Sequence, residues 1–199
     1  GNSANVPSAA VIKDGSEDVT ANYNITYVNG TLVVTENENA IVITSADKTW
    51  TYDSEVHKEE VYTVTYGQTA VAADATGKVF TLPTGDTITI TATAAGVKNV
   101  ADTAADNNTF TYVLTNPGQY TNVSTVVGDL GITKRDVTIT AGSDTKVYDG
   151  TALTKNTYTN TDLATGDAIT SVTVTGSQTV VGNSANVPSA AVIKDGSED

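Results

Sequence analysis

Cysteine and methionine are absent from this 199-residue sequence, and histidine and tryptophan occur once each. Without a thiol the chain has no disulfide, no cysteine-ligated zinc, no iron–sulfur cluster and no cysteine nucleophile. Basic residues are also scarce, with 10 Lys and Arg against 23 Asp and Glu and a net charge of -13. Such a charge repels nucleic acid and anionic lipid, so neither is an expected partner.

Long apolar runs are missing as well. No stretch approaches the roughly 20 residues of a membrane-spanning helix, so we expect no membrane insertion in this segment. About a fifth of the residues are threonine, which together with Val, Ile and Tyr favours strands, while Gly, Asn and Asp favour turns. The composition predicts an all-β protein.

The strongest pattern in the sequence is a repeat without a single mismatch. Residues 1–18 (GNSANVPSAAVIKDGSED) recur as residues 182–199, which gives a period of 181 residues. Eighteen identical positions do not arise by chance in so short a chain. The match predicts a window cut from a tandem array, and such arrays act as spacers or repeated binding surfaces more often than as enzymes.

A weaker repeat lies inside this period. The segment 50–54 (WTYDS) aligns with 146–150 (KVYDG), 84–89 (TGDTIT) aligns with 165–170 (TGDAIT), and 22–35 aligns with 119–133. Thr35 and Thr133 close their units 98 residues apart, which leaves 83 of the 181 residues for the other unit. One insertion within Val64 to Leu82 explains the difference, and its alternating runs around 73–77 predict an added β-hairpin.

We therefore predict three segments. Residues 1–35 are the carboxy-terminal part of one module, residues 36–133 a complete module with the inserted hairpin, and residues 134–199 the amino-terminal part of the next. Short strands separated by turns within 83 to 98 residues fit tandem immunoglobulin-like β-sandwich modules. β-Grasp-like modules are the alternative.

Local patterns predict individual elements. Asn29-Gly30 predicts a hairpin turn, Asp14-Gly15 and Asp149-Gly150 are weaker turn signals, and residues 19–23 fit one helical turn. Asp18 and Tyr23 fit either a tyrosine corner, in which the phenol bonds to the preceding loop, or an ordinary core tyrosine. Alternating residues predict strands at 22–28, 31–35, 40–44, 61–66, 87–93, 110–115 and 136–141.

Three ordered motifs carry a family resemblance. Lys146–Gly150 (KVYDG), Asp18–Ile25 (DVTANYNI) and Gly30–Thr35 (GTLVVT), with a linker at 133–135, together resemble the YDG/MBG-type repeats of large bacterial cell-surface proteins. The resemblance covers essentially the whole chain; the middle module departs from it at Ser54, where the pattern has Gly.

The resemblance implies an extracellular stalk or spacer segment on a bacterial cell surface that projects a functional domain, with neighbouring repeats of the same protein as partners. It supplies no catalytic residues. The alternative is an adhesive module that binds a host glycan or protein through the insertion at 64–82.

Candidates for chemistry are few, and we expect no enzyme, no catalytic or metal-binding residues and no cofactor. His57 is the single histidine, and Glu55, Glu59 and Glu60 predict a solvated acidic turn around it. A serine hydrolase would need a constrained nucleophile turn, and no Gly-x-Ser-x-Gly motif occurs; Ser54 is merely near His57 in sequence.

Acidic clusters offer a weaker hypothesis. Asp14, Glu17 and Asp18 recur at 195, 198 and 199, and their spacing fits a solvated turn better than a calcium loop. Glu36 and Glu38 mark either a polar linker or, less favourably, a calcium site between modules.

Aromatic and lysine side chains raise two further hypotheses. Trp50, Tyr52, Tyr62 and Tyr66 would form a sugar-stacking platform if they shared an exposed face, but core packing of Trp50 and Tyr52 is favoured. Four lysines are formally available for covalent crosslinks to asparagine side chains: Lys48, Lys58, Lys134 and Lys146. The sequence does not indicate which asparagine each lysine would join.

The terminal segments lead to a prediction about self-association. Each is a partial module whose apolar strand faces need a partner. We expect the amino-terminal segment of one molecule to complete the carboxy-terminal segment of another, in a head-to-tail chain or a swapped dimer. The duplicated strand sequences 8–13 and 189–194 would compete for one position, and modules joined by short linkers should form a rod.

Overall fold

A computed structural model describes residues 2–195. Strands make up nearly all its regular structure, and the helical content of the described residues is three single 3-10 turns, η1 (Thr20–Asn22), η2 (Val100–Asp102) and η3 (Pro117–Gln119). The all-β prediction is confirmed, as is the helical turn at 19–23. No helix among the described residues has the length and apolarity needed to cross a membrane.

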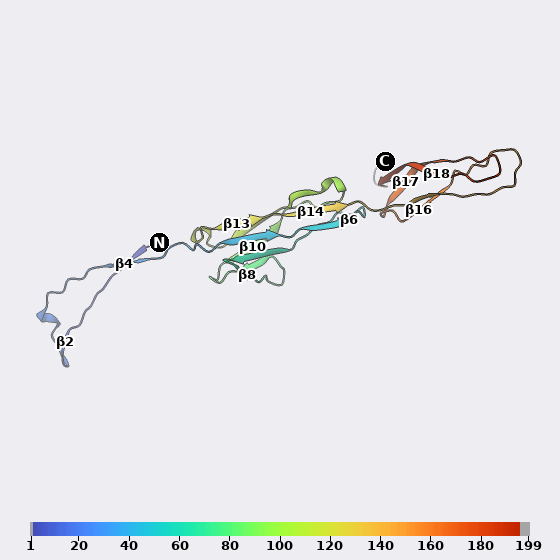
Figure 1. Cartoon of the computed structure of the whole chain (residues 1–199). Coiled ribbons are helices and arrows are strands. Elements are labelled where there is room, and N and C mark those ends of the chain that lie inside the picture. The colour runs from blue at the N-terminus through green and yellow to red at the C-terminus, as the bar shows by residue number, and fades with distance from the viewer. Residues whose placement is uncertain (1, 196–199) are drawn as a thin grey trace.

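The molecule is elongated, as Figure 1 shows. A central β-structure is flanked at one end by residues 2–35 and at the other by residues 134–195, and each flanking segment runs outward and folds back. Within residues 2–195, all buried apolar side chains lie between Ile41 and Ile132 except that of Ala164. The hydrophobic core of the described chain is therefore in the central part.

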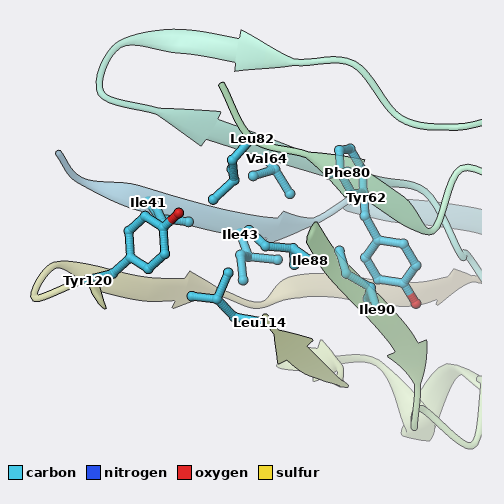
Figure 2. Packing of buried hydrophobic residues seen from close by; sticks show 10 residues of the cluster. All are labelled: Ile41, Ile43, Tyr62, Val64, Phe80, Leu82, Ile88, Ile90, Leu114 and Tyr120. Atoms are coloured by element: carbon cyan, nitrogen blue, oxygen red, sulfur yellow. The ribbon is translucent and has the colours of Figure 1, made fainter. Parts of the chain in front are cut away.

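Two sheets enclose the larger core cluster. One has the order β13-β5-β7-β8 and the other the order β12-β10-β9. Their strands are β5 (Ile41–Ser45), β7 (Tyr62–Tyr66), β8 (Thr69–Val71), β9 (Val79–Thr81), β10 (Thr87–Ala92), β12 (Phe110–Leu114) and β13 (Val123–Val126). Every second residue of β5 is fully buried, as a strand with one face toward a core requires. Figure 2 shows ten residues of this cluster converging from both sheets.

A third sheet continues the central structure toward the carboxy-terminal segment. It has the order β11-β14-β6, with β6 (Lys48–Thr51), β11 (Ala104–Asn108) and β14 (Gly128–Thr133). Leu130 and Ile132 of β14 form a second buried cluster with Val97, against which Trp50 and Tyr52 pack. The core therefore extends along the long axis as two clusters.

The first and last strands of the central structure lie side by side and parallel. β13 pairs with β5 in the register Val123↔Ile41, and β14 pairs with β6 in the register Leu130↔Lys48, with four residue pairs in each ladder. Because the strands are parallel, the chain enters this structure at one end of the ladders and leaves it at the other. This explains why the flanking segments emerge at opposite ends (Figure 1).

Both flanking segments contain only two-stranded pairings. In the amino-terminal segment β1 (Asn2–Asn5) pairs with β4 (Gly30–Val33), and β2 (Lys13–Asp14) pairs with β3 (Glu17–Asp18). In the carboxy-terminal segment β15 (Ile139–Ala141) pairs with β16 (Tyr158–Asn160), and β17 (Asp167–Thr175) pairs with β18 (Val187–Asp195). Two strands alone bury little apolar surface.

Strand predictions in the central part are confirmed to within one residue at their starts. The strand expected at 22–28 is wrong, because residues 24–29 have no partner strand and η1 occupies 20–22. The hairpin at Asn29-Gly30 is also wrong, since β4 pairs with β1 and neither residue has a positive φ. The Asp14-Gly15 turn is confirmed, with Gly15 at φ +57 between β2 and β3.

The inserted hairpin predicted within 64–82 is confirmed only at its tip, where the Asp74 N–H donates to the Val79 carbonyl at 2.8 Å. β8 pairs with β7 and β9 pairs with β10, so the segment crosses from one sheet to the other. A single bridge between Ala73 and Phe80 joins its two arms. The physical reason is burial: Phe80 and Leu82 enter the core, and this draws β9 into the sheet of β10.

Candidate functional site

His57 is a packing residue in this structure. Its ring stacks on Trp50 with centroids 4.9 Å apart, and its Nε2 lies 2.9 Å from Asp53 Oδ1. The side chain is 22% exposed. The pKa of Asp53 is lowered, first by the hydrogen bond that the Glu55 backbone N–H donates to it and then by His57.

The solvated acidic turn predicted around His57 is therefore wrong. Two of the nearby glutamates pair with lysines instead, Glu59 with Lys48 at 3.7 Å and Glu60 with Lys78. Sequence alone could not choose Asp53 over three nearer glutamates, because the choice depends on the bridge between His57 and Val97.

The four aromatic residues do not share an exposed face. Tyr62 lies in the larger core with its ring edge-on to Phe110, while Tyr66 packs on the same cluster. Trp50 and Tyr52 pack on the second cluster. The sugar-stacking platform is wrong, and core packing of Trp50 and Tyr52 is confirmed.

Acidic residues do not gather around a common point. The pKa of Asp18 is lowered, first by the Thr20 side chain and then by the Thr20 backbone N–H, which donates to Asp18 Oδ1 at 3.0 Å. No group of three His, Cys, Asp or Glu residues within 2–195 could hold a metal ion. Asp195, the counterpart of Asp14, pairs with Lys98 Nζ at 2.9 Å, and residues 198 and 199 lie outside the described residues.

The linker before β5 is organised by asparagines. Asn37 and Asn39 both donate from Nδ2 to the Tyr66 phenol oxygen, at 2.5 and 3.0 Å. Asn122 donates to the Glu38 carbonyl at 2.8 Å, while the Glu36 side chain is exposed. These contacts fix the point where the chain enters the central structure.

Two of the four lysines that are formally available for crosslinks make ion pairs. Lys48 pairs with Glu59, and Lys146 Nζ lies 2.8 Å from Asp149 Oδ1. No hydrogen bond from any of the four lysines to an asparagine side chain occurs in the part of the chain that the structure describes: Lys48, Lys58, Lys134 and Lys146.

The buried residue Tyr120 hydrogen-bonds to Asp86, the residue just before β10. Tyr120 donates to Asp86 Oδ2 at 2.5 Å and lies 2.5 Å from Thr84 Oγ1. The Tyr120 phenol is the main cause of the lowered pKa of Asp86, and burial is the main cause of the raised pKa of Tyr120. The aligned residue Tyr23 is 57% exposed, so both alternatives predicted for it, the tyrosine corner with Asp18 and the ordinary core tyrosine, are wrong.

The central structure meets the carboxy-terminal segment through a polar contact. Tyr52 and Ser54 each place a hydroxyl oxygen 3.4 Å from Asp167 Oδ1, and Arg135 Nη1 donates to the Tyr52 carbonyl at 3.5 Å. Ser54 has φ +72, a conformation that suits the glycine found at the aligned position 150. The one sequence signal for this contact is that Ser54 replaces the glycine of the repeat pattern.

Exposed large apolar side chains mark the flanking segments as the other candidate surface. The amino-terminal segment exposes Val6, Val11, Tyr23, Tyr27, Val28, Leu32, Val33 and Val34. The carboxy-terminal segment exposes Val147, Tyr148, Val180, Val181, Val187, Val192 and Ile193. So many exposed apolar residues in short segments are typical of interaction surfaces.

Comparison of the chain with protein-family models, with curated proteins and with solved structures finds no match. The resemblance to bacterial surface repeats thus stays a prediction, and the candidate surfaces stand on the chain's own geometry.

Proposed function

We propose that this chain is a stalk or spacer segment of a repetitive, extracellular bacterial cell-surface protein that projects a functional domain from the cell. Its modules are tandem immunoglobulin-like sandwiches, with a β-grasp-like module as the alternative, and it has no catalytic role. The repeat of residues 1–18 at 182–199 and the motif resemblance support the proposal.

One observation carries the mechanical part of this proposal. The ladders β5–β13 and β6–β14 join the first and last strands of the central structure in parallel. Tension applied at residues 36 and 133 runs along these strands, so the hydrogen bonds of a ladder are loaded together. A stalk under pull needs this resistance, whereas an enzyme or a soluble binding domain does not.

Single-molecule pulling tests the mechanical role. The chain has no cysteine, so attachment points can be introduced as single cysteines. Pulling between residues 36 and 133 should unfold the central structure at high force. The matched control pulls between residues 37 and 120, which form a parallel bridge at one end, so that the ladder opens one pair at a time. We expect a markedly lower force in the control; equal forces would contradict the proposal.

An adhesive module is the second candidate, and one ordered surface turn supports it. Asp74 Oδ1 accepts hydrogen bonds from the backbone N–H groups of Thr76, Lys78 and Val79, which holds the exposed turn within 64–82 in shape. Arrays of glycans and host matrix proteins test it. Saturable binding that disappears when residues 73–77 are replaced by a short Gly-Ser turn would favour adhesion over the stalk role.

A further inference from the structure

We propose that a second copy of this chain binds the carboxy-terminal segment through its residues 20–35, which add as parallel strands beside β15 and the residues that follow it. The binding completes a core that neither flanking segment forms alone. The proposal concerns the 199-residue chain itself and stands whether or not the chain serves as a stalk.

The central structure supplies the template for this binding. Its last strands, β13 and β14, cover the first strands, β5 and β6, and bury Leu130 to 1% exposure. The aligned sequence of the amino-terminal segment leaves Leu32 at 56% exposure. Tyr120 and Tyr23 differ in the same way, at 8% and 57%.

The carboxy-terminal segment reproduces the receiving half of the template. β5 pairs with β7 in the register Ser45↔Tyr62, and β15 pairs with β16 in the register Ala141↔Tyr158, which is the same register 96 residues later. On its other edge β5 is paired with β13, whereas β15 has β16 as its single partner strand among residues 2–195. An unpaired edge of this kind accepts an added strand.

An asparagine contact of the template is repeated in the carboxy-terminal segment. Asn108 donates from Nδ2 to the Ala46 carbonyl and is the register partner of Gly128 in β14. Asn186 donates from Nδ2 to the carbonyl of Gly142, the residue 96 positions after Ala46. The Oδ1 atom of Asn186 is buried without a hydrogen-bond partner. Such an atom is costly to leave unpaired, and it lies beside Gly176 within the carboxy-terminal segment.

The amino-terminal segment already has the shape of the inserting half. η1 is followed by Tyr23 as η3 is followed by Tyr120. β1 pairs with β4 in the register Asn5↔Gly30, which matches the pairing Asn108↔Gly128 between β11 and β14, so β1 holds the place that residues 183–186 of the receiving copy take on docking. Residues 20–35 carry no charged side chain, so the inserting strands bring no charge into this contact.

Glycine at the inserting strand has a specific role in the template. A Cβ on Gly128 would come within 2.5 Å of the Ala46 carbonyl oxygen, so only glycine fits there. A Cβ on Gly30 meets the Asn5 Cβ at 3.7 Å, an ordinary contact. Gly30 is therefore dispensable in the single chain and required once the segment docks.

A second copy, rather than the same chain, must supply the inserting strands. Figure 1 shows the two flanking segments at opposite ends of the central structure. Within each chain residues 187–193 already pair with β17 as part of β18, while the identical residues 6–12 form no strand. The competition between the duplicated sequences is thus resolved in favour of the carboxy-terminal copy, and residues 6–12 of the incoming chain stay displaced.

Sedimentation velocity and light scattering over a concentration series test the proposal on the 199-residue chain. We expect dimers or longer head-to-tail species that dissociate on dilution. Gly30→Ala should weaken association at least about tenfold, while Gly118→Ala, with open space around its Cβ, should not. Leu32→Asp should also weaken association, because it places a charge where an apolar side chain is buried on docking. Thr31→Asp should leave association unchanged, because the aligned residue of the central structure is already an exposed aspartate, Asp129.

Crosslinking tests the register. A Thr26→Cys chain mixed with a Thr138→Cys chain should form a disulfide between copies, because the aligned residues Ser124 and Val42 are register partners. Thr159→Cys, on the far strand β16, is the matched control and should not crosslink with Thr26→Cys. A strict monomer at all concentrations, or equal crosslinking in both mixtures, would overturn the proposal. Unchanged Trp50 fluorescence shows that the central structure is intact in every variant.

Discussion

Aligned residues of this chain lie in opposite environments, and this makes single substitutions informative. Leu130 is buried against Val97 and Ile132, whereas Leu32 at the aligned position is exposed. The same contrast holds for Tyr120 and Tyr23. The same type of side chain should therefore contribute more to the free energy of unfolding in the central structure than in the flanking segments.

Truncating the two leucines measures this contrast. Leu130→Ala should lower the free energy of unfolding of the central structure by about 2–5 kcal/mol, because it leaves a cavity in the second cluster. Leu32→Ala should change it by less than about 0.5 kcal/mol, as for an exposed site. Urea denaturation followed by Trp50 fluorescence gives both values. Equal losses would mean that Leu32 belongs to the same core.

Acid should destabilise the central structure through Asp86. The Tyr120 hydrogen bond lowers the pKa of Asp86 below its unfolded value, so the carboxylate stabilises the fold above about pH 4. That contribution is lost as the pH falls through the lowered pKa. Tyr120→Phe should therefore make the fall in Tm between pH 5 and pH 2.5 shallower. Tyr112→Phe, at an exposed tyrosine of β12, is the control; identical slopes in the two variants would contradict this role of Tyr120.

Alternation predicted strands both in the centre and in the flanks, where β4 and β15 overlap the expected ranges 31–35 and 136–141, but it failed at 22–28. Alternation at 41–45, 62–66, 87–92 and 110–114 finds partner strands within the central structure. Residues 22–28 alternate equally well but have no partner in this chain and form no strand. Periodicity predicts a strand only where another strand is available to pair with it.

Candidate sites were harder to predict, because contacts depend on which strands meet. The pairing of His57 with Asp53 and Trp50 follows from the bridge to Val97. The contact of Tyr52 with Asp167 joins residues 115 positions apart, a separation that local patterns do not detect. The burial of Trp50 and Tyr52 was predictable from their size and apolar surface.

Hydrogen exchange tests the effect of pairing at the scale of one element. Residues 6–12 and 187–193 have the same sequence, VPSAAVI, but only the second copy is paired, with β17. We expect amides of 187–193 to be protected and those of 6–12 to exchange close to the unfolded rate, apart from Ala10 and Ile12, whose N–H groups donate to the side chains of Tyr27 and Thr20. NMR resolves the two copies because their surroundings differ. Equal protection would show that both copies occupy strands.

At the scale of the whole molecule, the central structure holds the hydrophobic core, and a flanking segment extends from each of its two ends. Parallel first and last strands place residues 36 and 133 at opposite ends of the central structure, and both flanking segments extend from there (Figure 1). Polar contacts of Asp167 with Tyr52 and Ser54 then join the centre to the next segment. Successive 181-residue units should therefore be strung end to end.

Small-angle X-ray scattering from chains of one, two and three successive 181-residue units tests this central claim most directly. The account predicts that the maximum dimension increases by an equal amount with each unit while the cross-sectional radius stays constant. A maximum dimension that levels off, with the profile of a compact particle, would contradict it.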